Sequence, residues 1–232
     1  MEHFSKPEDA LVGTVCLGMA DSLFELALEN ALIDYHRRFP RVRVELMLDP
    51  VSDLMDQLRH GQLDAACLIT DPLPASEWMV WDEIEVPIVV VANTRHPLAR
   101  STRVQPKELV EQELILMEAS APYSLRFQQF LGQWHLDCEP FLRLQSADTA
   151  RRLVEREAAF LSVLPLYTVQ DAIRRGTLCV LDLQEWRYTQ FVQLVMHRNK
   201  ALTPQIEGFL QELRLVLRQV LSHRLPSSPK EP

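Results

Sequence analysis

The hydrophobic positions along the first part of the chain alternate between two periods. Residues 12–19 form a mostly apolar run, which predicts a strand. The apolar positions over 21–39 then recur every three or four residues, which predicts a helix with Asp21 or Ser22 as its capping residue. Pro40 ends that helix, because its ring cannot continue an interior turn, and 42–48 has the alternating polarity of a second strand.

A second helix is predicted between Ser52, a candidate capping residue, and Gly61, which supplies a left-handed exit. The continuous apolar run 63–69 that follows is typical of a strand buried on both faces. The five elements form a β-α-β-α-β unit, which requires parallel strands with right-handed crossovers. Because ligands in such sheets bind beyond the carboxyl ends of the strands, we expect one wall of a pocket at three strand ends, 20–22, 49–52 and 69–71.

The same alternation returns later in the chain. Apolar runs at 113–118, 141–145 and 159–165 predict strands, and a helical pattern follows each of them, with Ser146 as the capping residue of the second helix. Two long extended runs, 83–99 and 189–199, can carry the chain from one lobe to the other and back, and a last amphipathic helix opens at Thr203 and Pro204. The predicted organisation is a discontinuous lobe of 11–87 plus 190–224, a continuous lobe of 88–189, and flexible termini at 1–10 and 225–232.

Composition narrows the classes of function. The 232 residues carry a net charge of −8, which argues against this chain binding DNA or an anionic membrane by itself. The N-terminus lacks the apolar region of a signal peptide, and the apolar runs are shorter than a membrane span. The four cysteines lie far apart without a Cys-x-x-Cys pair, so we expect no metal site, no cofactor and a cytoplasmic protein with reduced thiols.

Catalytic motifs are absent from the sequence. It contains no Gly-x-Ser-x-Gly elbow, no phosphate-binding loop, no dinucleotide fingerprint and no His-Glu-x-x-His pair, and its seven histidines show no ligand spacing. Prephenate dehydratases share a bilobal fold of the predicted kind, but their Thr-Arg-Phe motif does not occur here. We therefore expect a protein that is not an enzyme.

An ordered set of segments resembles the effector-binding domain of LysR-type transcriptional regulators. The segments are VGTVCLGMADS, YHRRFPRVRVEL, LMDQLRHGQLDAACL, VPIVVVANTRHPLA and LVEREAAFLSVLP, and an amphipathic helix follows VMHRNKALTP. The resemblance covers nearly the whole chain and implies an α/β, periplasmic-binding-protein type II-like fold with two Rossmann-like lobes joined by two crossover strands. It also implies that the family's N-terminal helix-turn-helix is absent from this chain and that DNA is reached only through it.

The resemblance places candidate effector contacts at the strand ends of both lobes. Ser22 matches a position where family members often hold the effector's carboxylate or phosphate, and a helix start favours an anion. Val51 stands where a threonine is frequent, so Ser52 either replaces that hydroxyl or only caps its helix. Glu118 would repel an anion unless a cation paired with it, so it could equally mark a cationic or polar ligand. The complete predicted set is Ser22, Val51, Ser52, Ile69, Thr70, Glu118, Ser120, Ser146 and Pro165.

The implied partner is a small-molecule effector that binds between the lobes and shifts their arrangement. Family dimers form side by side and antiparallel, which would place 24–39 and 42–48 against 123–135 of a second copy; the full-length protein could also form a tetramer. Redox sensing through Cys67 or Cys138 is not expected, because peroxide sensors of this family use a nearby cysteine pair. Two alternatives remain open at this point: a solute-binding protein of the same fold, and an oligomerisation module with a vestigial pocket.

Overall fold

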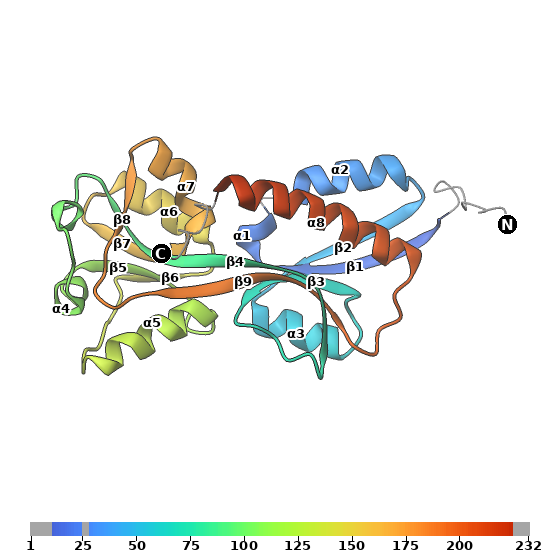
Figure 1. Ribbon diagram of the computed structural model, residues 1–232, viewed down its shortest axis with the longest axis horizontal. Helices are drawn as coiled ribbons and strands as arrows, with labels where there is room; N and C mark the ends of the chain where they lie inside the picture. Colours follow the sequence, from blue (N-terminus) through green and yellow to red (C-terminus); the bar gives the residue numbers. More distant parts are fainter. Residues whose placement is uncertain (1–10, 25–27, 225–232) are drawn as a thin grey trace, which may run out of the picture. The chain divides into compact units, whose positions relative to one another are not determined.

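The computed structural model describes residues 11–24 and 28–224, which form a mixed α/β structure. Its strands make a nine-stranded mixed sheet in the order β2-β1-β3-β9-β4-β7-β5-β6, with β8 paired to β4 (Figure 1). The described residues up to Ile84, together with Val192–Val220, form one compact unit. Glu85–Phe191 and the described residues from Leu221 to Arg224 form the other. Two long strands, β4 (Trp78–Asn93) and β9 (Tyr188–His197), therefore belong partly to each unit.

The first unit is built around three parallel strands. β1 lies between β2 and β3 and pairs in parallel with both, with Met19 opposite Leu48 on one side and Cys67 on the other. The predicted parallel β-α-β-α-β arrangement is confirmed. Its elements in chain order are β1 (Gly13–Met19), α1 (Asp21–Leu23), α2 (Glu29–Arg38), β2 (Val42–Leu48), α3 (Val51–Arg59) and β3 (Ala65–Thr70).

The helix predicted over 21–39 does not have one regular geometry. α1 covers only Asp21–Leu23, Phe24 and Leu28 have π-helical geometry, and α2 begins at Glu29; residues 25–27 lie outside the described part. The residue at the capping position of α1 is Ala20, whose methyl group cannot accept a hydrogen bond, so the prediction that Asp21 or Ser22 caps the helix is wrong. The predicted stop is confirmed, because α2 ends at Arg38, two residues before proline.

The start of α3 corrects a second predicted cap. α3 begins at Val51, directly after Pro50, so the residue at the capping position is Pro50, two residues earlier than predicted. Ser52 therefore lies inside the first turn, and its hydroxyl donates to Asp53 Oδ1 at 3.1 Å instead of capping the helix. Gly61 has a φ of +69°, which confirms the predicted left-handed exit.

The second unit repeats the three-stranded arrangement with β5 in the centre. β5 pairs in parallel with β6 and β7, while β7 and the short β8 pair antiparallel with β4. β8 was not predicted, because four residues are too few to show a period. The elements are η3 (Pro97–Arg100), α4 (Pro106–Val110), β5 (Glu113–Met117), α5 (Pro122–Gln133), β6 (Leu142–Leu144), α6 (Ala147–Arg156), β7 (Phe160–Pro165), α7 (Leu166–Arg174) and β8 (Leu178–Leu181).

Two helix starts in this unit differ from each other. α5 begins at Pro122, which suits a first helical position because it has no N–H group to leave unbonded, so Ser120 lies exposed in the turn before the helix. Ser146 does cap α6, as predicted: its hydroxyl accepts a hydrogen bond from the backbone N–H of Thr149 at 3.3 Å.

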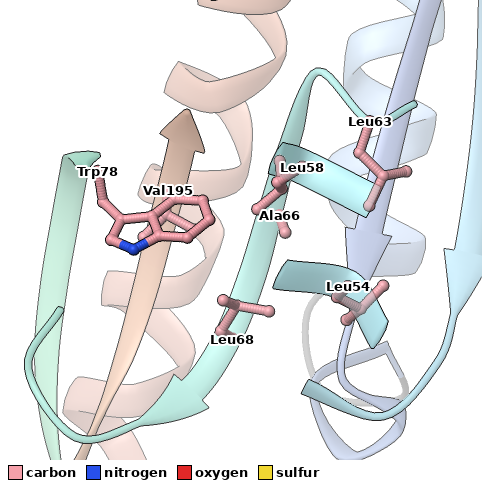
Figure 2. Close-up of a cluster of buried hydrophobic side chains, with 7 residues drawn as sticks. All are labelled: Leu54, Leu58, Leu63, Ala66, Leu68, Trp78 and Val195. Carbon is pink, nitrogen blue, oxygen red and sulfur yellow. The ribbon is translucent and has the colours of Figure 1, made fainter. Parts of the chain in front are cut away.

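A compact apolar cluster lies beneath α3 in the first unit (Figure 2). It joins that helix to β3, β4 and β9, and burial of each large aliphatic member contributes about 1.5–3 kcal/mol. The fully buried members are Leu54, Leu58, Leu63, Ala66, Leu68, Trp78 and Val195. Trp78 also has the guanidinium of Arg59 at 5.4 Å from its ring and the ring of His197 at 5.9 Å.

The last helix, α8 (Pro204–Arg224), begins where the sequence predicts, and Thr203 Oγ1 accepts from the N–H of Ile206. It packs on α2: the Tyr35 hydroxyl donates to the Gln205 carbonyl at 2.9 Å, and the Tyr35 and Phe209 rings lie 4.9 Å apart. The predicted apolar face of α8 is buried. No helix within 11–24 or 28–224 is both long and apolar enough to cross a membrane.

The core of the second unit centres on an aromatic group. Trp186 lies 5.4 Å from the Phe127 ring and 5.2 Å from the Phe130 ring, both of α5. Its indole N–H donates to the Ile88 carbonyl on β4 at 2.9 Å. The aromatic group therefore fastens α5 and the segment before β9 to the same strand.

Candidate functional site

The first candidate surface is the edge at which β1, β2 and β3 end. Because these strands are parallel, their carboxyl ends meet at one edge of the sheet, and the N–H of Ala20 donates to the Cys67 carbonyl at 3.1 Å to hold the end of β1 on β3. The structure brings all five predicted residues of this unit to that edge. They are Ser22 after β1, Val51 and Ser52 after β2, and Ile69 and Thr70 at the end of β3.

The helix starts at this edge each combine a candidate hydroxyl with an acidic side chain. α1 begins at Asp21, whose side chain in the first turn opposes an anion near Ser22. α3 has nine residues, and Val51 and Ser52 are the first two, where backbone N–H groups have no intrahelical acceptor. The acidic side chain of Asp53 in the same turn opposes an anion there.

The end of β3 is the most enclosed part of this edge. Ile69 and Thr70 have only 4% and 8% of their surface exposed. The backbone beyond them is held by Gln193 of β9, whose Nε2 donates to the Asp71 carbonyl at 2.9 Å and whose Oε1 accepts from the N–H of Leu73 at 3.3 Å. Sequence reasoning missed Gln193, because a single polar residue inside an apolar strand gives no periodic signal.

The second candidate surface is the edge at which β5, β6 and β7 end. The N–H of Glu118 donates to the Leu144 carbonyl at 2.9 Å, and the amide of Gln145 donates to Glu118 Oε2 at 3.0 Å, so the ends of β5 and β6 are tied together. The predicted residues of the second unit lie at this edge: Glu118 and Ser120 after β5, Ser146 at the start of α6, and Pro165 at the end of β7.

The second edge is polar and carries a negative charge. The hydrogen-bond partner of the Glu118 carboxylate is the neutral amide of Gln145. Burial, and then the charge of Glu118, raise the pKa of the Tyr123 hydroxyl beneath it. The Pro165 carbonyl already accepts from the Thr168 hydroxyl at 2.7 Å, so Pro165 offers mainly its ring. This edge therefore suits a ligand that donates hydrogen bonds.

The cysteines and the possible metal ligands of the described residues determine whether redox sensing or metal binding could occur there. All four cysteines are free thiols, and burial raises the pKa of Cys67, Cys138 and Cys179, which lowers the fraction present as reactive thiolate. Within 11–24 and 28–224, no group of three or more histidine, cysteine or acidic residues could hold a metal ion.

A family model and a curated relative match this chain over most of its length. The model described as "LysR substrate binding domain" matches residues 8–218. The HTH-type transcriptional activator CmpR of Synechocystis sp. (strain ATCC 27184 / PCC 6803 / Kazusa) is 21% identical over 180 residues. That alignment covers 78% of this chain but only 59% of the relative, so this chain spans less than two thirds of that protein's length.

Solved structures show the same fold at low sequence identity. The CcmR regulatory domain of Synechocystis PCC6803, in complex with 2-PG, matches with a TM-score of 0.74 and 20% identity, over 88% of this chain and 97% of that one. The effector-binding domain of QuiR, in complex with shikimate, matches with a TM-score of 0.70 and 14% identity, over 93% and 100%. The fold is thus the periplasmic-binding-protein type II-like fold of these domains. Since the family model covers most of the chain, the chain belongs to the LysR substrate-binding domain family, the non-enzymatic effector-binding part of LysR-type transcription regulators.

Proposed function

We propose that this chain is the ligand-sensing domain of a bacterial, cytoplasmic LysR-type regulator. It binds a small polar molecule between two Rossmann-like lobes that two crossover strands join, and it passes the signal to a DNA-binding domain outside this chain. The observation that carries the proposal is the pair of parallel strand edges, one in each unit, that end in polar residues in a chain of this family. Relatives of the same fold, CcmR and QuiR, were solved with 2-PG and shikimate.

The two edges supply complementary groups for such a ligand. The hydroxyls of Ser22 and Thr70 and the backbone N–H groups at the start of α3 favour a polar or anionic group. The carboxylate of Glu118 favours a hydrogen-bond donor. An effector that carries both kinds of group fits this set better than a simple dianion.

The effector acts by selecting one arrangement of the lobes. It shifts their equilibrium only by its differential affinity for the two arrangements, and the coupling to DNA binding is typically about 1–3 kcal/mol. The ligand therefore need not create a new structure; it changes the population of one that the protein already visits.

Ser22→Trp tests the ligand site. The bulky indole should abolish ligand-induced stabilisation in a thermal-shift screen with 2-PG, shikimate and a panel of small polar metabolites, while the melting temperature without ligand stays close to that of the wild type. Gln62→Trp is the matched control, because Gln62 is exposed just before the start of β3, at the opposite end of that strand. An unchanged ligand response in Ser22→Trp would refute the assignment of this edge.

We also propose that the chain forms a homodimer, in which α2 and β2 of one copy meet α5 of the other. Large apolar side chains are exposed on these elements: Ile33 by 50%, Met47 by 48%, Leu48 by 44% and Leu125 by 50%. A tetramer in the full-length protein remains a prediction. Analytical ultracentrifugation at tens of micromolar should show a dimer, and Met47→Glu should dissociate it. Leu215→Glu, on the exposed face of α8, is the control and should leave the dimer intact. A wild-type monomer under these conditions would contradict the dimer.

A further inference from the structure

Gln193 is a buried polar residue that the sheet itself does not require. Its side chain is 0% exposed, and both ends of its amide are used: Nε2 donates to the Asp71 carbonyl at 2.9 Å, and Oε1 accepts from the N–H of Leu73 at 3.3 Å. A buried amide is stable only when its groups are hydrogen-bonded, so this pairing is what allows a glutamine at this position. The contacts join β9 to a segment 120 and 122 residues earlier in the chain.

The segment that Gln193 holds can form few hydrogen bonds of its own. It reads Asp71-Pro72-Leu73-Pro74, and neither proline has a backbone N–H group. The Leu73 N–H is thus the one amide donor between the two prolines, and Gln193 accepts its hydrogen bond. Inside a sheet, the backbone of a neighbouring strand would donate to the Asp71 carbonyl and accept from the Leu73 N–H. Here the side-chain amide of Gln193 makes both of these hydrogen bonds.

The same segment is anchored on its apolar side. Leu73 packs against the buried cluster that includes Trp78 and Val195, and Val195 follows Gln193 by two residues on β9. Immediately before the segment, Ile69 and Thr70 end β3. β3 and β9 are neighbouring strands of the sheet. Beyond the end of β3, the chain is held to β9 by the two hydrogen bonds of Gln193 and by the packing of Leu73 on the cluster that includes Val195.

We propose that Gln193 is a positioning residue that extends the attachment of β3 to β9 beyond the last residue of β3, holds Asp71 and Leu73 against β9, and so fixes the position of Thr70. This role rests on the proposed function, in which Thr70 contacts the effector. β9 continues into the second unit at Phe191, two residues before Gln193. A ligand that displaces the end of β3 therefore also displaces β9 through Gln193, and β9 is a strand that both units share.

Hydrogen exchange of the ligand-free protein, measured by NMR, tests the clamp. In Gln193→Met, which keeps an unbranched side chain but removes both polar groups, the Leu73 amide should exchange roughly tenfold faster. The Thr70 amide should gain microsecond-to-millisecond motion in relaxation dispersion, while amides in the middle of β3 stay protected. Gln193→Glu, when its buried carboxyl is protonated, keeps an acceptor for the Leu73 N–H and a donor for the Asp71 carbonyl, so at acidic pH it should restore the protection of Leu73.

Gln190→Met is the matched control. Gln190 is also 0% exposed and also on β9, but its amide donates to the Tyr188 hydroxyl at 3.0 Å and not to the segment after β3. A purely structural role predicts that both variants lower the stability to urea and leave the Leu73 amide equally protected. Leu73 exchange within twofold of the wild type in Gln193→Met would overturn the proposal. Because no ligand is used, this failure is distinct from an effector screen in which the wild type binds nothing.

Discussion

The two units build similar three-stranded parallel edges but hold the central strand by different means. In the first unit, a Cβ added at Gly18 of β1 would lie 2.6 Å from Leu63 Cδ1 and 2.7 Å from Leu54 Cδ2, so the strand is held by close apolar packing. In the second unit, the Ser162 hydroxyl donates to the Ile115 carbonyl of β5 at 2.7 Å, and the Ser124 hydroxyl donates to the Met117 carbonyl at 3.2 Å. The N–H of Cys16 on β1 also donates to Asp64 Oδ2 at 2.7 Å, but that hydrogen bond is only partly buried. The close apolar contact thus belongs to the first central strand, and the fully buried side-chain hydrogen bonds belong to the second.

The largest effect should come from filling the close contact in the first unit. Gly18→Val should lower the free energy of unfolding by about 3 kcal/mol, because an overpacked core forces side chains out of their preferred rotamers. Urea unfolding measures the change. Gly132→Ala in the second unit is the control: nothing lies within 4 Å of an added Cβ there, and the helix should gain up to about 1 kcal/mol. If Gly18→Val lowers the free energy of unfolding by less than about 1 kcal/mol, close packing does not distinguish the first central strand from the second.

A smaller effect is expected from deleting the hydrogen bonds of the second unit. Ser124→Ala combined with Ser162→Ala should cost about 2 kcal/mol, because each lost buried hydrogen bond contributes roughly 1 kcal/mol. The same urea titration applies. Ser101→Ala, at an exposed serine of this unit, should change stability by less than about 0.5 kcal/mol. If the double variant loses no more stability than that control, the two buried hydrogen bonds do not stabilise β5, and the proposed difference between the units is wrong for the second unit.

The smallest effect concerns a carboxylate of the second unit and depends on pH. Burial acts to raise the pKa of Glu155, but hydrogen bonds from Thr177 and Arg175 and the charge of Arg151 outweigh it and lower the pKa below the usual 4.5. The unfolded chain therefore takes up the proton first as the pH falls, so the stabilisation is present at neutral pH and is lost in acid.

Glu155→Gln should thus cost about 1 kcal/mol at neutral pH, a modest value because Arg175 is half exposed. The difference from the wild type should shrink as the pH falls below 4.5 and should vanish once the pH lies below the lowered pKa of folded Glu155, where both side chains are uncharged. Thermal unfolding across this range gives the profile. A difference that stays constant with pH would show that the lost contact is steric and not electrostatic.

Local stop signals made much of the first unit predictable from sequence. Pro40 and Gly61 act through their own backbones, a fixed ring in one and a permitted left-handed φ in the other, so the ends they predict do not depend on distant residues. The parallel order of the strands followed from the alternation of periods. A strand as short as β8 forms only because it pairs with β4, which lies far away in the sequence, so its own residues do not predict it.

Helix starts and site residues were less predictable. Ser52 could cap a helix by its chemistry, but α3 begins two residues earlier than that cap requires, directly after Pro50. Ser146 stands directly before its helix and caps α6 as predicted. Gln193 gave no signal at all, because its role depends on the backbone of residues 71 and 73, which only the folded sheet brings within reach.

The tryptophans Trp78 and Trp186 provide each unit with its own optical reporter. Trp78 lies in the apolar cluster of the first unit beside the Arg59 guanidinium, while Trp186 lies among the phenylalanines of α5 in the second. With Trp81, Trp134 and either Trp78 or Trp186 replaced by phenylalanine, each single-tryptophan version would emit from one unit. Fluorescence could then follow the melting of either half, or its response to a bound metabolite, without an attached dye.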